Sequence, residues 1–136
     1  MSLKILSPFG PKMAKLSLPK PLVAKINQEV DKIITSNTLS KKYNYSKQLA
    51  GEVEQEIELP NLFVNKFLKK FFETNIKSFV KDVTGKTAKQ VKLKNFWVVR
   101  QFANDYNPIH FHDGDISGVG YLKLPKNFSK SKKKYS

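Results

Sequence analysis

The run NDYNPIHFHDGDISGVGYLKLP, residues 104–125, decides the fold and carries the chain's most informative chemistry. It contains both histidines of the sequence, His110 and His112, two positions apart. In an extended backbone, side chains at positions i and i+2 point to the same face, so the two imidazoles can converge on one point. Imidazole is a good ligand for iron, zinc, nickel or copper, so this spacing predicts a metal site. Asp113 and Asp115 follow directly, and they can supply either a carboxylate ligand or acceptors that orient the imidazoles.

The sequence on both sides of the histidines has the two-residue period of β-strands. Residues 88–102 form the longest such signal, and they become apolar on both faces around Phe96 to Val99, as in a strand covered by a second layer. Residues 104–108 predict a turn and residues 109–113 an extended segment. After Gly114, a further strand is expected over 116–125.

Two segments in the first part of the chain have the three- and four-residue apolar spacing of amphipathic helices. The first is residues 21–36, which begins with a proline suited to a first helical turn. The second is residues 61–83, a phenylalanine stripe with Asn61 as the expected N-cap and Gly85 as its stop. Residues 1–21 are expected to form an opening strand or arm. Helices followed by a strand-rich half predict an α+β fold with the helices on the outside of a sheet.

Residues 37–60 are polar and predict a loop, with short strand structure near residues 53–59. Four glutamates there alternate with other side chains: Glu52, Glu54, Glu56 and Glu58. Paired carboxylates would suit acid–base chemistry, but alternation of this kind is more typical of an exposed sheet edge, so a solvated face is favoured.

Length and composition indicate one folded domain, residues 1–125, followed by a basic, low-complexity tail, residues 126–136. The chain has no cysteine, which excludes disulfides and thiolate metal sites. No apolar run approaches the roughly 20 residues that span a bilayer, and prolines interrupt the N-terminus where a signal peptide needs a continuous apolar stretch. We therefore expect a soluble cytoplasmic protein, or one of the host cytoplasm if the chain is viral.

The formal charge of +14 raises the possibility of an anionic partner such as nucleic acid. However, Arg100 is the only arginine among the 25 basic residues, whereas surfaces that read bases depend on the bidentate guanidinium. Solvated lysines are the favoured interpretation, and a lysine-rich nucleic-acid-binding module stays open as an alternative.

The run WVVRQFANDYNPIHFHDGDISGVGYLKLP, residues 97–125, resembles the core of the 2-oxoglutarate and iron(II)-dependent oxygenases of marine bacteria and their phages, which are relatives of the prolyl hydroxylases. In that family, an aromatic strand leads through an Asn-Pro turn to His-x-His and then to a Ser-Gly-containing strand. Residues 48–51 and the helix after them are also similar, so the resemblance covers residues 45–125.

The resemblance implies a double-stranded β-helix, a cupin-like jelly roll, with iron(II) at its open end and 2-oxoglutarate and dioxygen as cosubstrates. His110 and His112 carry over as metal ligands, with Asp113 or Asp115 as substitutes. We expect Arg100, Gln101 and Tyr121 near 2-oxoglutarate. The superfamily usually has a carboxylate where this chain has His112, and its distal histidine and basic 2-oxoglutarate clamp are not found in this sequence. The expectation is therefore an incomplete oxygenase, either a fragment or one part of a split protein.

One further alternative belongs to another functional class. A jelly-roll protein of phage or bacterial origin can keep the barrel, lose the metal and serve as a non-catalytic binding or structural protein. The sequence does not identify a substrate. An incomplete barrel would expose sheet edges, so self-association into a homo-oligomer is also open.

Overall fold

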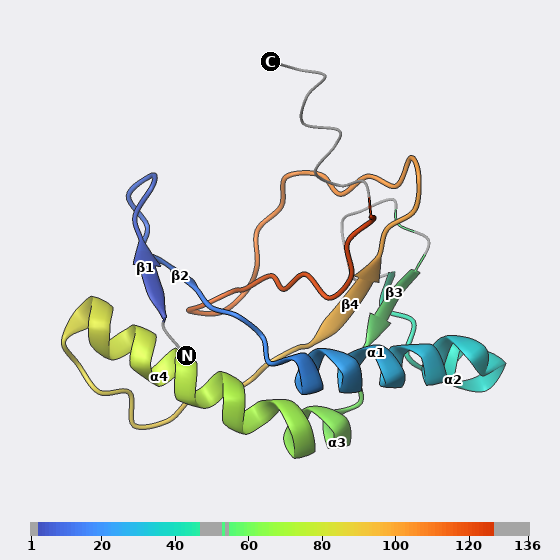
Figure 1. Ribbon diagram of the computed structural model, residues 1–136, viewed down its shortest axis with the longest axis horizontal. Coiled ribbons are helices and arrows are strands. Elements are labelled where there is room, and N and C mark those ends of the chain that lie inside the picture. The colour runs from blue at the N-terminus through green and yellow to red at the C-terminus, as the bar shows by residue number, and fades with distance from the viewer. Residues whose placement is uncertain (1–2, 47–52, 54, 127–136) are drawn as a thin grey trace.

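A computed structural model of the chain describes residues 3–46, 53 and 55–126 (Figure 1). The predicted tail beyond residue 126, the segment 48–51 and two of the four alternating glutamates lie outside these residues. The described part combines helices with two small antiparallel sheets, which is an α+β architecture.

The two sheets have two strands each and differ in their surroundings. Strands β1 (Lys4–Leu6) and β2 (Met13–Lys15) form a hairpin that stands apart from the sheet formed by β3 and β4 (Figure 1). This hairpin is the predicted opening arm. Strands β3 (Gln55–Glu58) and β4 (Trp97–Arg100) pair antiparallel, and an isolated bridge from Asn44 to the other edge of β3 makes β3 the central strand.

The helices agree with the periodicity of the sequence. Helix α1 (Lys20–Thr35) matches the first predicted helix, and α3 (Asn61–Phe63), a π-helical turn (Val64–Leu68) and α4 (Lys69–Thr84) together match the second. Gly85 ends α4 with φ at 71°, as expected of a left-handed C-cap. Among the described residues, no helix is both long and apolar enough to cross a membrane.

Two local predictions need correction. Residues 37–60 were expected to be a loop, but they begin with a short helix, α2 (Asn37–Lys42), which Ser36 caps by accepting a hydrogen bond from the Leu39 amide. The N-cap of α3 is Pro60 rather than Asn61, which is already the first helical residue. A proline without an amide hydrogen fits this position because its donor would be unsatisfied there.

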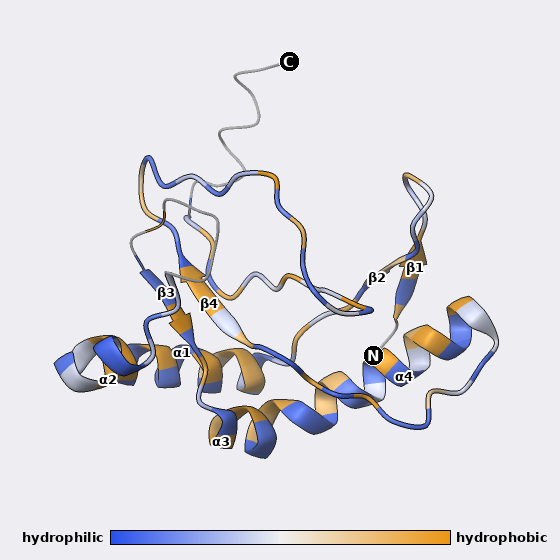
Figure 2. Ribbon diagram, turned by 180° about the vertical axis from the view of Figure 1, so that it is seen from behind, coloured by the Kyte–Doolittle hydropathy of each residue, from blue (hydrophilic) through white to orange (hydrophobic). Residues whose placement is uncertain are grey.

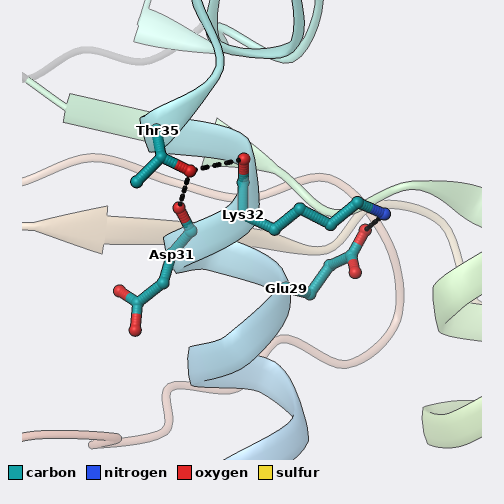
Figure 3. Close-up of polar contacts among 4 residues, drawn as sticks. All are labelled: Glu29, Asp31, Lys32 and Thr35. Atoms are coloured by element: carbon teal, nitrogen blue, oxygen red, sulfur yellow. Dashed lines mark hydrogen bonds and ion pairs between the residues drawn. The ribbon is translucent and has the colours of Figure 1, made fainter.

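The C-terminal turn of α1 is held by local polar contacts (Figure 3). The Thr35 hydroxyl donates to the carbonyls of Asp31 and Lys32 at 2.9 and 3.2 Å, and Lys32 forms an ion pair with Glu29. These contacts lie on the exposed side of the helix, so they leave its apolar side free for the core.

The core lies between the helices and one face of the β3–β4 sheet (Figures 1 and 2). Side chains that alternate along a strand point to opposite faces, so Ile57 and its partner Val98 point toward the helices. The buried residues of this cluster come from α1, β3, the connection after it and the helical segment that follows: Leu22, Ile26, Val30, Ile33, Ile57, Leu59, Phe63, Val64 and Leu68.

The strands predicted around the histidines are shorter than expected or not formed. Within residues 88–102, only Trp97–Arg100 is a strand, and residues 101–126 form no named strand but loop over the sheet on the side away from the helices (Figure 1). Alternation shows that a segment is able to form a strand, whereas a partner must supply the hydrogen bonds. Strand β4 exists where β3 pairs with it.

The core position of Leu68 gives a stability prediction. Leu68 is 0% exposed, and Leu62 in the same helical segment is 85% exposed. We expect Leu68→Ala to lower the free energy of unfolding by about 2 to 5 kcal/mol, since it leaves a cavity. Leu62→Ala, the matched control, should change it by less than about 0.5 kcal/mol. Urea unfolding followed by circular dichroism measures both, and equal losses would contradict this core.

Candidate metal centre

A tight turn brings the histidine segment back over the sheet after β4. The Phe102 amide donates to the Asp105 carboxylate at 2.9 Å, and Asn104 adopts a left-handed conformation with φ at 74°. Asparagine is one of the residues that tolerates this conformation, so the local sequence favours the reversal. The chain therefore returns along the sheet face opposite the helices, carrying His110 and His112 with it.

The two imidazoles converge, as the sequence predicts. The Nε2 atoms of His110 and His112 lie 3.1 Å apart, and their rings are nearly perpendicular, at 80°. The Nδ1 atom of His110 lies 2.7 Å from the carbonyl oxygen of Pro108. A carbonyl can only accept, so Nδ1 carries the proton and the Nε2 lone pair of His110 is available. A backbone acceptor on the other ring nitrogen is the usual support of a metal-binding histidine.

The spacing of the two nitrogens suits one metal ion. Two nitrogens each about 2.1 Å from an ion are about 3.0 Å apart at a right angle and about 3.4 Å apart at a tetrahedral angle. The observed 3.1 Å lies between these values. Without an ion, the same distance is a hydrogen bond from His112 Nε2–H to His110 Nε2, and a metal would require His112 to shift its proton to Nδ1. The pair therefore fits a chelating role with one change of tautomer.

Aromatic side chains of the sheet lie beneath the histidine pair. The Trp97 ring is 5.7 Å from that of His112, and Tyr45 stacks on Trp97 at 5.7 Å and 25°. The Tyr45 hydroxyl accepts a hydrogen bond from Asn95 at 3.2 Å, which fixes the tyrosine in place. Trp97 thus excludes water from one side of the pair, while both histidines stay exposed on the other.

Glu56 is the residue that the sequence interpretation placed wrongly. It was assigned to a solvated edge, but its side chain is only 2% exposed, and neither carboxylate oxygen has a hydrogen-bond partner among the described residues. The reason is that β3 is a central strand, paired on both edges and covered on both faces. Burial raises the pKa of Glu56, and an electrostatic contribution from His110 partly opposes that rise.

The two predicted carboxylate ligands lie elsewhere. Asp113 is 84% exposed and forms an ion pair with Lys94, Oδ2 to Nζ 3.9 Å, while Asp115 is also exposed. Within the described part of the chain, no three histidine, aspartate or glutamate side chains close around one point. The structure therefore brings the two histidines together and leaves these aspartates apart from them.

The residues predicted to contact 2-oxoglutarate are also dispersed. Arg100 alternates with Val99 and so faces the helix side of the sheet, where it donates to the side-chain carbonyl of Gln55. Gln101 is exposed just after β4. Tyr121 is 71% exposed on the segment that also carries the histidines. Of the three, Tyr121 shares the histidine segment, and Arg100 faces away from it.

A hollow of the described structure lies away from the histidines. It has a volume of about 320 Å³ and lies among α1, α2 and the start of the second helical segment, lined by residues such as Glu29, Tyr43, Phe63 and Phe67. This hollow is open and belongs to the helix layer, so it forms no part of the candidate metal centre.

The buried carboxylate gives a pH prediction for the metal-free protein. Because the pKa of Glu56 is raised above its ordinary 4.5 in the folded state, its contribution to stability is complete below that value and is lost as pH rises through the folded-state pKa. We expect Glu56→Gln to remove this loss, so that the variant gains stability relative to wild type as pH rises.

Urea unfolding between pH 4 and 8, with a chelator present, measures this difference. Glu58→Gln is the control, because Glu58 lies two residues away on the same strand and is only half-buried. A wild type whose stability does not fall relative to Glu56→Gln as pH rises would contradict the assignment of Glu56 as a buried, unpaired carboxylate.

Comparison of the chain with protein-family models, with curated proteins and with solved structures gives no match.

Proposed function

We propose that the chain is a domain of the iron(II) and 2-oxoglutarate-dependent dioxygenase type, with His110 and His112 as metal ligands. The observation that supports it best is the 3.1 Å approach of their Nε2 atoms together with the anchoring of His110 Nδ1 on the Pro108 carbonyl. The same 3.1 Å is a hydrogen bond between the imidazoles when no ion is bound, and it is also within the range that two nitrogen ligands of one ion adopt. A divalent ion bound by both Nε2 atoms would replace this hydrogen bond with two coordinate bonds.

When bound, the iron and its cosubstrate would supply the oxidising chemistry for hydroxylation, and the protein would supply geometry and a partly dry site. His110 would offer Nε2 in a fixed tautomer, since Pro108 holds the proton on Nδ1. His112 would be oriented by its contact with the Trp97 ring, which also covers one side of the site. Tyr121 is retained as the proposed contact of 2-oxoglutarate because its exposed phenol lies on the histidine segment.

The jelly-roll barrel is part of this proposal and needs more strand pairing than the described residues contain. A barrel of this type has two sheets of about four strands. Strands β3 and β4 would form part of one sheet, and residues 109–113 and 116–125 have the alternation that lets them join when partner strands are present. The face carrying Trp97 and Val99 would then point into the barrel, toward the metal.

The metal site is tested by anaerobic titration of the protein with iron(II) and 2-oxoglutarate. We expect a weak visible charge-transfer band in the wild type, and we expect His110→Ala or His112→Ala to abolish it, since each removes one of two ligands. Asp115→Asn is the control, because this exposed side chain lies outside the histidine pair. A wild type that binds no iron(II) by equilibrium dialysis, or variants that bind as tightly as wild type, would contradict the proposal.

A second candidate function, non-catalytic binding, is favoured by the apolar surface of the same segment. Large hydrophobic side chains between residues 102 and 124 are exposed, and contiguous apolar surface often marks an interaction site. They are Phe102, Tyr106, Ile109, Phe111, Ile116, Val119, Tyr121 and Leu124. The lysine-rich composition supports nucleic-acid binding only through overall charge, without an arginine cluster.

Self-association separates the binding function from the metal function. If the apolar surface is the functional feature, we expect concentration-dependent oligomers in analytical ultracentrifugation that the double variant Phe111→Ser/Val119→Ser disrupts and that a chelator leaves unchanged. Both side chains are more than four-fifths exposed, so the substitutions should preserve the fold. Oligomers that vanish with the metal instead would argue against binding as a separate function.

A further inference from the structure

We infer that the hollow of the helix layer is a binding site for a small amphipathic carboxylate, an organic acid with a hydrocarbon body, of which a medium-chain fatty acid is the simplest example. The hydrocarbon would lie against the apolar side chains of the hollow, and the carboxylate would meet the lysines at its rim. The site is separate from the histidine pair, because it lies among the helices, whereas the histidines lie on the other face of the β3–β4 sheet.

The lining of the hollow is mainly apolar. Ile33 of α1 is fully buried and Leu62 of α3 is 85% exposed, so the apolar lining extends from the core to the surface. The volume of about 320 Å³ is at the lower end of the roughly 300 to 1,000 Å³ of small-molecule sites, which points to a small ligand. The other large apolar residues of the lining are Leu39, Tyr43, Phe63 and Phe67.

Lysine side chains lie over two aromatic rings of this lining. The Nζ atoms of Lys25 and Lys66 lie 4.6 and 5.2 Å from the centre of the Phe67 ring, and they come from α1 and from the π-helical turn. The Nζ atom of Lys42 lies 5.2 Å from the centre of the Tyr43 ring. The face of an aromatic ring attracts an ammonium group, so these contacts hold three positive charges beside the apolar lining.

The positive charge at the rim is balanced only in part. Lys32, which also lines the hollow, forms an ion pair with Glu29 at 3.7 Å (Figure 3). Lys25, Lys42 and Lys66 form no ion pair with a carboxylate in the part of the chain that the structure describes. Lys25 and Lys66 contact the same ring although like charges repel, and an anion bound at the rim would reduce that repulsion.

Two other anionic partners fit the hollow less well. A simple inorganic anion would use the lysines and leave the apolar lining unused. A single-stranded nucleic acid would stack its bases on open ring faces, whereas lysines already lie over the Phe67 and Tyr43 rings. The pairing of an apolar lining with a positive rim is therefore matched best by one molecule that has both a hydrocarbon body and a negative charge.

The test is an amide NMR titration of the protein with octanoate and with two matched probes. Octanol has the same hydrocarbon without the charge, and acetate has the charge without the hydrocarbon. We expect octanoate to bind with a Kd on the order of 1 mM, as is typical of so small a ligand, and both probes to bind at least fivefold more weakly. The amides that shift should include those of Leu62 and Lys66.

Variants at the hollow separate the charge from the apolar lining. We expect Lys25→Gln/Lys66→Gln to weaken octanoate binding fivefold or more and to leave the affinity for octanol within twofold. Leu62→Ala should weaken both ligands threefold or more. Lys77→Gln is the matched control, because this lysine is exposed on α4 and does not line the hollow, and it should bind octanoate within twofold of wild type. Thermal melts check that each variant is folded.

Two further variants test whether binding belongs to the hollow or to the histidine side of the sheet. Phe111→Ser/Val119→Ser removes exposed apolar side chains of the histidine segment, and His110→Ala removes a proposed metal ligand. Both should bind octanoate within twofold of wild type. A loss of octanoate affinity in the Ser/Ser variant equal to that in Leu62→Ala would place the ligand on the histidine segment and overturn the inference.

Four other results would also overturn it. Octanoate that produces no saturable shift shows that the hollow does not bind such a ligand. Octanol as tight as octanoate removes the role of the lysines, and acetate as tight as octanoate removes the role of the lining. Equal losses in Lys77→Gln and in the double lysine variant assign the effect to the net charge of +14. An oligonucleotide that displaces octanoate from wild type and loses affinity in the double lysine variant assigns the rim to nucleic acid.

Discussion

The antiparallel pairing of β3 with β4 is the constraint on which the rest of the structure depends. Its register sends Ile57 and Val98 to one face and Glu56 and Trp97 to the other. The first face is covered by α1 and the second helical segment, which makes the core. The second face receives the returning segment with the histidines. A shift of one residue would exchange the two faces, placing the carboxylate among the helices and the core side chains beneath the histidines.

The face of the β3–β4 sheet that carries Glu56 and Trp97 has some features that lower the stability of the fold and others that would favour binding of a ligand. The apolar surroundings that exclude water also raise the pKa of the Glu56 carboxyl, and the nearby imidazoles are held together by a single hydrogen bond. Functional sites often keep such unfavourable groups because a bound partner compensates them. The helix face shows the opposite character, with a continuous apolar cluster and local polar contacts confined to the helix surface. The sheet thus separates the part that stabilises the fold from the part that we propose binds the metal.

Residues 101–126 show why strand signals need a partner. Their sequence alternates and carries aromatic and β-branched side chains, yet they form an irregular loop in which most large apolar side chains are exposed, while Leu122 packs against the core cluster. A strand is stable only when a neighbouring backbone takes up its hydrogen bonds. In this part of the chain the ladder ends at Arg100, which pairs with Gln55, the first residue of β3, and the Asx-type turn at Asp105 then redirects the backbone. Residues 101–126 therefore have the sequence pattern of strands, but they belong to neither of the two sheets in the described part of the chain.

The sequence by itself determined the two long helical segments, the left-handed cap at Gly85 and the coming together of His110 and His112, because these depend on spacing along the chain and on local backbone preference. Tertiary structure decided how far β4 extends, which way Arg100 points and whether Glu56 meets water. Those properties depend on segments far apart in sequence, such as the bridge from Asn44 that makes β3 a central strand. An alternating run of glutamates looks like an exposed edge when read alone, and only the pairing on both sides of β3 explains why Glu56 is buried.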